Sequence, residues 1–193
     1  QGWEGEFGVY DDRFIPSLTK LTHSIHRYEG LVFAQLFHGG IRSPEYLTGM
    51  QPISADKVEC KESKSGFSIK ASENDIKRII KEFTSAAIRC VNAGFDGVEL
   101  HGAHGYLISQ FLSKSINKRK DRWGGDLKGR SRFLLEIYKS IRKHVPEKFI
   151  VGIRLSPEIK GLEISLDASL KLVKKISHLG VDFIHLSCWD IYA

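Results

Sequence analysis

Cysteine is scarce in this chain of 193 residues: only Cys60, Cys90 and Cys188 are present. Their spacing matches no metal-binding or redox motif, and three cysteines do not build a disulfide framework. We therefore expect a reducing, cytoplasmic compartment. No apolar run approaches the roughly 20 residues of a membrane helix, so we expect no membrane partner. The polar opening Gln1–Glu4 lacks a methionine and a secretory leader, and we interpret it as the product of processing or excision from a longer protein.

Charge of one sign is not in large excess, because the net charge is +6. Much of the basic charge falls in one segment, at Lys114, Lys118, Arg119, Lys120 and Arg122. This segment is interpreted either as a solvated loop or as a binding surface for a phosphate-bearing ligand. Nucleic acid is not expected as a partner, because no basic strand with interleaved aromatic residues accompanies the run.

Hydrophobic residues make up 41% of the chain, enough for a real core, and we treat residues 1–193 as one domain that is complete or part of a larger one. Helical periodicity alternates with short apolar runs four times. The expected helices cover residues 13–28, 73–92, 131–145 and 166–179, and the expected strands cover 31–36, the segment after Gly94, 149–155 and 181–187. This order predicts parallel strands joined by crossover helices. The long connection 37–72 indicates a functional loop or an inserted subelement.

The strands also carry polar residues in alternating positions. The first helix has an apolar stripe that includes Leu21. In the strands, the apolar residues Val98, Leu100, Val151, Ile153 and Leu186 are expected to point toward the helices. The other face then carries Gln35, Glu99, His101, Arg154, His185 and Ser187. A doubly wound sheet would bury this polar face against helices at a high cost. The pattern therefore favours an α/β barrel with a site at the carboxyl ends of its strands. The alternative is a polar core whose members satisfy one another.

A cluster of His101, His104 and Tyr106 follows the central strand. A metal site is one alternative, but the spacing differs from that of a helical zinc site and no third ligand is evident, so no metal is expected. A structural pair of histidines is another. The favoured interpretation is that two imidazoles hold one substrate oxygen while the Tyr106 phenol gives a proton.

The stretch Gly94–Leu107, GFDGVELHGAHGYL, resembles the central segment of the old yellow enzyme family, which are FMN-dependent NAD(P)H oxidoreductases on a TIM barrel. The resemblance extends over nearly the whole chain. Further matching segments are Ala34–Gly40, Gln110–Ser113, Asn117–Arg119, Asp121–Gly125, Arg130–Phe133, Val151–Ser156 and His185–Ser187. The His-x-x-His version followed by Tyr106 is similar to the bacterial branch.

The resemblance implies a role for each matching site residue. Gln35 would bind the pyrimidine edge of FMN, and Arg154 would lie near flavin N1 and O2. His101 and His104 would bind the carbonyl oxygen of a small enone or related acceptor, and Tyr106 would protonate the adjacent carbon. NADH or NADPH would be the reductant, and the flavin would carry the redox chemistry.

Two departures from the family pattern qualify this implication. Asp126, Lys128 and Gly129 differ from the residues usual after the Gly124–Gly125 pair, and the chain is much shorter than family members. It matches about four of eight βα units, a partial TIM barrel without the strands that grip the FMN phosphate. We therefore expect an ene-reductase present as a fragment. The alternative is a non-catalytic half-barrel that only self-associates, and a homo-oligomer is expected because open sheet edges remain.

Overall fold

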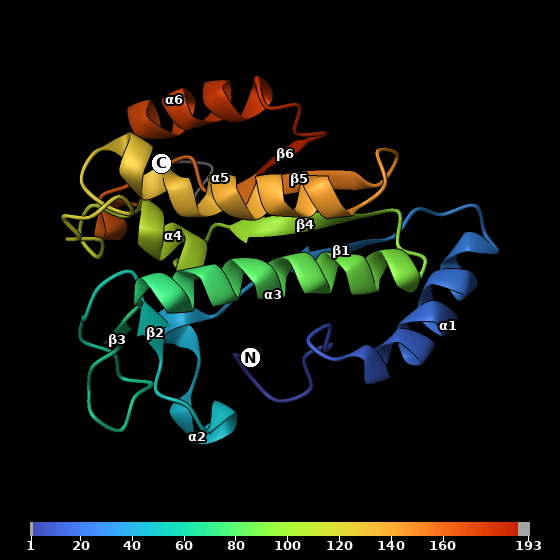
Figure 1. Cartoon of the computed structure of the whole chain (residues 1–193), viewed down its shortest axis with the longest axis horizontal. Helices are drawn as coiled ribbons and strands as arrows, with labels where there is room; N and C mark the ends of the chain where they lie inside the picture. The colour runs from blue at the N-terminus through green and yellow to red at the C-terminus, as the bar shows by residue number, and fades with distance from the viewer. Residues whose placement is uncertain (1, 189–193) are drawn as a thin grey trace.

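The computed structural model describes residues 2–188 and contains one parallel sheet of four strands in the order β1-β4-β5-β6 (Figure 1). The strands are β1 (Phe33–Leu36), β4 (Gly97–Gly102), β5 (Ile150–Leu155) and β6 (Ile184–Leu186). Each adjacent pair is parallel, with Gln35 opposite Glu99 and Glu99 opposite Gly152. The predicted order of parallel strands and crossover helices is therefore confirmed.

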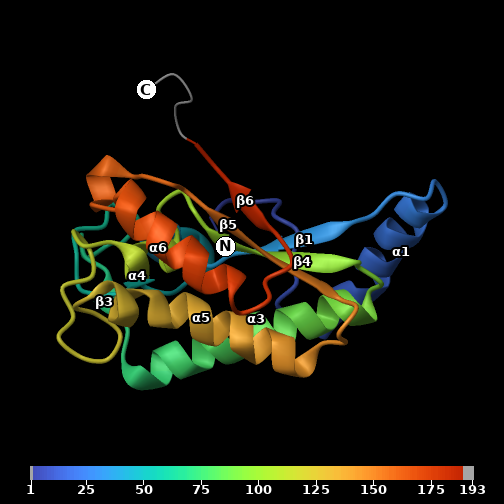
Figure 2. The same cartoon turned by 90° about the horizontal axis from the view of Figure 1, so that it is seen from above.

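The helices that connect the strands are amphipathic, and α3 and α5 lie together on one side of the sheet (Figure 2). The long helices are α1 (Ile15–His26), α3 (Glu73–Asn92), α5 (Leu127–His144) and α6 (Leu166–Ser177), and the short α4 spans Leu107–Leu112. Single turns occur at η1 (Asp12–Phe14), η2 (Gly40–Arg42), α2 (Glu45–Thr48) and η3 (Lys160–Leu162). Ser72 begins α3 with a capping box, because its hydroxyl accepts from the Asp75 amide and the Asp75 carboxylate accepts from the Ser72 amide.

Two helices differ from their predicted boundaries or faces. Helix α5 begins four residues earlier than predicted, because the Asp126 carboxylate caps it by accepting from the Gly129 amide at 2.8 Å. In α1, the predicted apolar position Leu21 is 39% exposed, and Thr22 is buried instead. The Thr22 hydroxyl donates to the Ala93 carbonyl at 2.6 Å, which attaches α1 to the end of α3.

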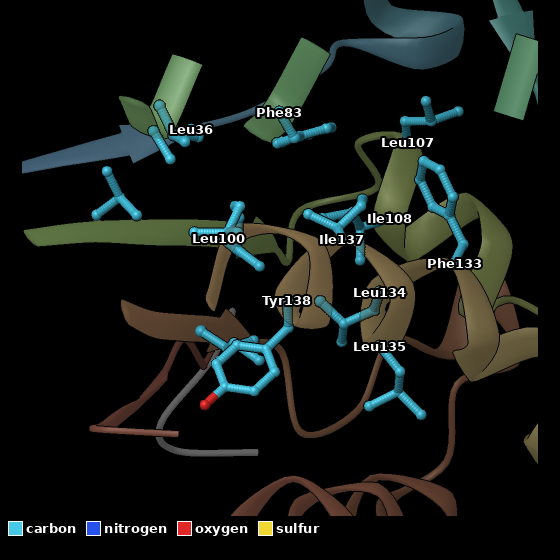
Figure 3. Packing of buried hydrophobic residues seen from close by; sticks show 14 of the residues in the cluster. Leu36, Phe83, Leu100, Leu107, Ile108, Phe133, Leu134, Leu135, Ile137 and Tyr138 are labelled. Atoms are coloured by element: carbon cyan, nitrogen blue, oxygen red, sulfur yellow. The ribbon is translucent and has the colours of Figure 1, made fainter. Parts of the chain in front are cut away.

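The core lies between the sheet and the helices on that one side (Figure 3). Val98, Leu100, Val151 and Ile153 are fully buried there, as the strand alternation predicted. The prediction for Leu186 was wrong, because its side chain is 57% exposed. The polar face of the sheet is the opposite one.

The connection between β1 and α3 is an inserted subelement, one of its two predicted forms. It contains β2 (Ile53–Ser54) and β3 (Ile69–Lys70), which pair in parallel. Arg119 holds this subelement to the basic loop by donating to the Ala55 and Ala71 carbonyls at 2.8 and 2.7 Å. The other basic side chains of this loop, Lys114, Lys118, Lys120 and Arg122, are exposed, so Arg119 is the one among these five that is buried. Among residues 2–188, no helix has the length and apolar character needed to span a bilayer.

Candidate active site

The predicted site residues meet at the carboxyl end of the sheet. His101 is in β4, and His104 and Tyr106 lie in the turn between β4 and α4. His104 and Gly105 adopt left-handed backbone angles, with φ of 58° and 74°. For a non-glycine residue this conformation costs about 1 kcal/mol. The turn brings the two imidazole rings to 4.9 Å between centroids.

Tyr106 packs against the first histidine and against residues that follow β1. Its ring centroid is 4.9 Å from that of His101 and 5.0 Å from that of Phe37. The Arg42 guanidinium lies 4.8 Å above the tyrosine ring, and it also donates to the His104 carbonyl at 2.8 Å. The Tyr106 side chain is buried except for 8% of its surface, and its hydroxyl forms no hydrogen bond within residues 2–188. This hydroxyl is therefore available to a ligand.

Both histidines are held in the neutral form at physiological pH. Burial, followed by the nearby His104 and Arg154, lowers the pKa of His101 from 6.5 to about 4. Burial and the charges of Arg154 and Arg42 also lower the pKa of His104. The Nδ1 atom of His101 accepts from the Ala103 amide at 3.3 Å, so the neutral ring carries its proton on Nε2. His101 can therefore donate one hydrogen bond to a substrate oxygen.

We expect stability to fall on mild acidification because of these histidines. His101 and His38 both have a pKa lowered to about 4, chiefly by burial, whereas the unfolded chain binds the same protons near pH 6.5. The free energy of unfolding therefore decreases as the pH falls from about 6.5 to 4. Urea unfolding at pH 6.5 and 4.5 measures this loss, and a His38→Asn/His101→Asn double variant serves as the control. An equal loss in the variant would contradict the assignment.

A second set of polar side chains lies on the same face of the sheet, and some of its hydrogen bonds are made between its own members. The Arg154 guanidinium donates through Nη2 to the Ser187 hydroxyl at 3.0 Å, and that hydroxyl lies 2.6 Å from His104 Nε2. Glu99 accepts from Gln35 and is hydrogen bonded to His185. The alternative interpretation, a polar core whose members hydrogen bond to one another, therefore holds in part. However, Arg154 Nε is buried without a hydrogen-bond partner among the described residues, which leaves a donor for a ligand.

Sequence reasoning placed Glu99, His185 and Ser187 on this face through the strand alternation but gave them no role. It missed Phe37 and Arg42, because they lie in an irregular connection where no periodicity shows which way a side chain points. Within residues 2–188, no three or more histidine, cysteine, aspartate or glutamate residues are grouped so that they could hold a metal ion.

Known proteins match this chain over almost its full length. The model of the NADH:flavin oxidoreductase / NADH oxidase family matches residues 1–192. A probable NADH-dependent flavin oxidoreductase, YqiG of Bacillus subtilis, is 35% identical over 99% of this chain and 52% of its own length. The solved old yellow enzyme homologue from Zymomonas mobilis has a TM-score of 0.87 at 28% identity, covering 97% of this chain and 56% of that one.

A second solved structure, morphinone reductase in complex with tetrahydroNAD, has a TM-score of 0.84 at 27% identity and covers 93% of this chain and 55% of its own. The chain therefore spans about half the length of these relatives, and its fold is part of an old yellow enzyme TIM barrel, as the sequence predicted. The match to the family model over residues 1–192 shows that the chain belongs to the NADH:flavin oxidoreductase / NADH oxidase family.

Proposed function

We propose that this chain forms the substrate-binding and flavin-pyrimidine-binding part of an FMN-dependent NAD(P)H oxidoreductase that reduces the C=C bond of an α,β-unsaturated carbonyl. The proposal rests on the group of side chains that share the polar face of the parallel sheet. Two neutral histidines lie there, together with the Tyr106 hydroxyl, which forms no hydrogen bond within residues 2–188. The same face carries Arg154, whose buried Nε–H has no partner among the described residues. The family membership and the matched relatives support the same chemistry.

The residues present fit FMN. The unsatisfied Nε–H of Arg154 and the remaining valences of the Gln35 amide are the groups that a flavin pyrimidine ring would complete. Arg154 supplies a positive charge for an anionic ring edge. Bound FMN would supply the hydride chemistry, with NADH or NADPH as the reductant. Morphinone reductase in complex with tetrahydroNAD supports a nicotinamide partner.

The histidines and the tyrosine have different roles toward the substrate. His101 and His104 hydrogen bond to the carbonyl oxygen, and neutral rings donate without already carrying a charge. These donors stabilise the negative charge that develops on the oxygen when the far carbon of the double bond gains a hydride. The Tyr106 hydroxyl gives its proton to the carbon next to the carbonyl. The substrate is a small enone or a related acceptor.

Oxidation of NADH or NADPH at 340 nm tests this function, with FMN present and 2-cyclohexenone as acceptor. We expect turnover that requires both FMN and the enone. His101→Ala should raise the KM for the enone and weaken the binding of phenols, while FMN content stays nearly unchanged. Loss of FMN from His101→Ala would contradict the role assigned to His101, and no enone-dependent turnover in the wild type would contradict the function.

Self-association is a second candidate role, and the exposed apolar residues at the end of the sheet favour it. Leu166 and Leu170 of α6 are 51% and 60% exposed, and Leu186 of β6 is 57% exposed. The outer strands β1 and β6 each have one unpaired edge within the described residues. We expect light scattering to find a dimer or larger species, because pairing of two half-barrels covers these groups. A monomer that unfolds cooperatively would contradict this role.

A cytoplasmic location is also part of the proposal. Cys60, Cys90 and Cys188 are all free thiols, and two of them are buried. A reducing compartment suits a chain whose described cysteines form no disulfide.

A further inference from the structure

We propose that Glu99 is a positioning residue that orients the Gln35 amide, so that the amide oxygen of Gln35 is presented to a ligand N–H. This inference rests on the proposed function, because the ligand is the pyrimidine ring of a flavin. Glu99 does not contact the reacting atoms in this account. It acts through Gln35, and it determines which end of that amide the ligand meets.

The geometry connects three strands through one carboxylate. Glu99 lies in the middle of β4, and only 7% of its surface is exposed. Its Oε1 atom accepts from Nε2 of Gln35 at 2.5 Å, and Gln35 is directly opposite in the register of β1. Its Oε2 atom lies 2.9 Å from Nδ1 of His185, so the carboxylate reaches across β5 to β6. Both oxygens are therefore engaged, which leaves the carboxylate little freedom to rotate.

The chemistry of a carboxylate decides how the amide must point. An ionised carboxylate can only accept hydrogen bonds, whereas a glutamine amide has an accepting end and a donating end. The NH₂ group of Gln35 therefore faces Glu99, and its oxygen faces away. Gln35 is exposed, and its oxygen accepts no hydrogen bond within residues 2–188. Without Glu99, the two orientations of the amide would differ much less in energy.

An oriented amide of this kind recognises one pattern of ligand atoms. Its oxygen accepts from an N–H group, and the second N–H of its NH₂ group donates to a neighbouring carbonyl. An imide edge, such as N3–H beside a carbonyl in the flavin pyrimidine ring, carries this pattern. A flavin that has a methyl group on N3 has no proton to give to Gln35. Glu99 should therefore make the site selective for flavins with an unsubstituted imide.

The flavin experiment compares FMN with 3-methyl-FMN by fluorescence titration of the full chain. We expect the wild type to prefer FMN by about tenfold, the value of one hydrogen bond of about 1.4 kcal/mol. In Glu99→Gln the preference should fall several-fold, because position 99 can then donate and the Gln35 amide can turn over. Glu136→Gln on α5, which removes a carboxylate paired with Arg122, is the matched control and should keep the wild-type preference.

A second readout needs no flavin, and its main comparison uses the wild-type chain alone. The hydrogen bond to Glu99 should slow solvent exchange of one Gln35 side-chain amide proton in NMR spectra of the unliganded chain. The side-chain amide of the exposed Asn74, which forms no hydrogen bond to the described residues, provides the reference for fast exchange. In Glu99→Gln this protection should decrease, and thermal unfolding of the variant reports whether the fold is intact.

The possible results distinguish the role of Glu99 from the proposed function of the chain. An unchanged FMN preference in a folded Glu99→Gln variant would overturn the inference. The inference would also be overturned if the side-chain amide protons of Gln35 exchange as fast as those of Asn74 in the wild type. This result holds even if the Glu99→Gln variant does not fold. A wild-type chain that binds neither flavin would contradict the proposed function, and the exchange at Gln35 would still decide the role of Glu99.

Discussion

Tyr106→Phe is expected to slow enone reduction by about 10²- to 10⁴-fold, the usual value of a positioned proton donor. The substitution removes only the hydroxyl, which forms no hydrogen bond within residues 2–188. The ring keeps its packing against His101, Phe37 and Arg42. Fold and flavin content should therefore stay the same, and the loss should appear in kcat with little change in KM.

The control for this variant is the reductive half-reaction, in which NADH reduces the flavin and no proton comes from tyrosine. Stopped-flow bleaching of the flavin absorbance by NADH should proceed at a similar rate in wild type and Tyr106→Phe. Reoxidation by 2-cyclohexenone should account for the whole loss. Equal slowing of both halves would indicate that the hydroxyl organises the site and does not deliver the proton.

Arg119→Ala is expected to lower the free energy of unfolding by about 3 kcal/mol or more. The guanidinium is buried and donates to the carbonyls of Ala55 and Ala71, two residues with at most 1% of their surface exposed. Its removal leaves these carbonyls without a donor, and each unsatisfied buried group costs about 1–3 kcal/mol. It also removes the partner that lowers the pKa of Asp121 through a side-chain hydrogen bond.

Urea unfolding at pH 7 measures this effect, with Lys118→Ala and Lys120→Ala as matched controls. Both lysines flank Arg119 and are exposed, so their removal should change stability by less than about 0.5 kcal/mol. Arg119→Lys should recover only part of the loss, because an ammonium cannot reproduce the planar fork of the guanidinium. Similar stability for Arg119→Ala and the lysine variants would show that the inserted subelement does not depend on this residue.

The sheet and its polar face could be predicted because both follow from local patterns. The alternation of helical and strand segments gave the parallel order, and period-two alternation separated Val98 and Leu100 from Glu99 and His101. The placement of His101, His104 and Tyr106 followed from one rule, that the carboxyl ends of parallel strands share an edge. The resemblance to a family then supplied roles for Gln35 and Arg154, and these roles remain proposals.

The predictions failed where the structure depends on contacts that the local sequence pattern does not show. Leu186 and Leu21 follow their apolar patterns, yet neither is covered, because burial depends on which element packs opposite. Helix α5 starts before its predicted first residue because Asp126 caps it, and comparison of Asp126 with the family pattern does not reveal this cap. The buried clamp at Arg119 lies in a charged run, where the pattern indicates a solvated loop. No local signal shows that its guanidinium reaches carbonyls more than 45 residues away in the sequence.

The absorption spectrum of the purified chain tests the central claim most directly. After incubation with FMN and desalting, we expect the flavin bands between roughly 350 and 500 nm to remain with the wild type. They should weaken strongly in Arg154→Ala, which removes the unsatisfied Nε–H from the face. A colourless wild type would contradict the claim that this face forms an FMN site in this chain. Full flavin content in Arg154→Ala would contradict the assignment of that residue.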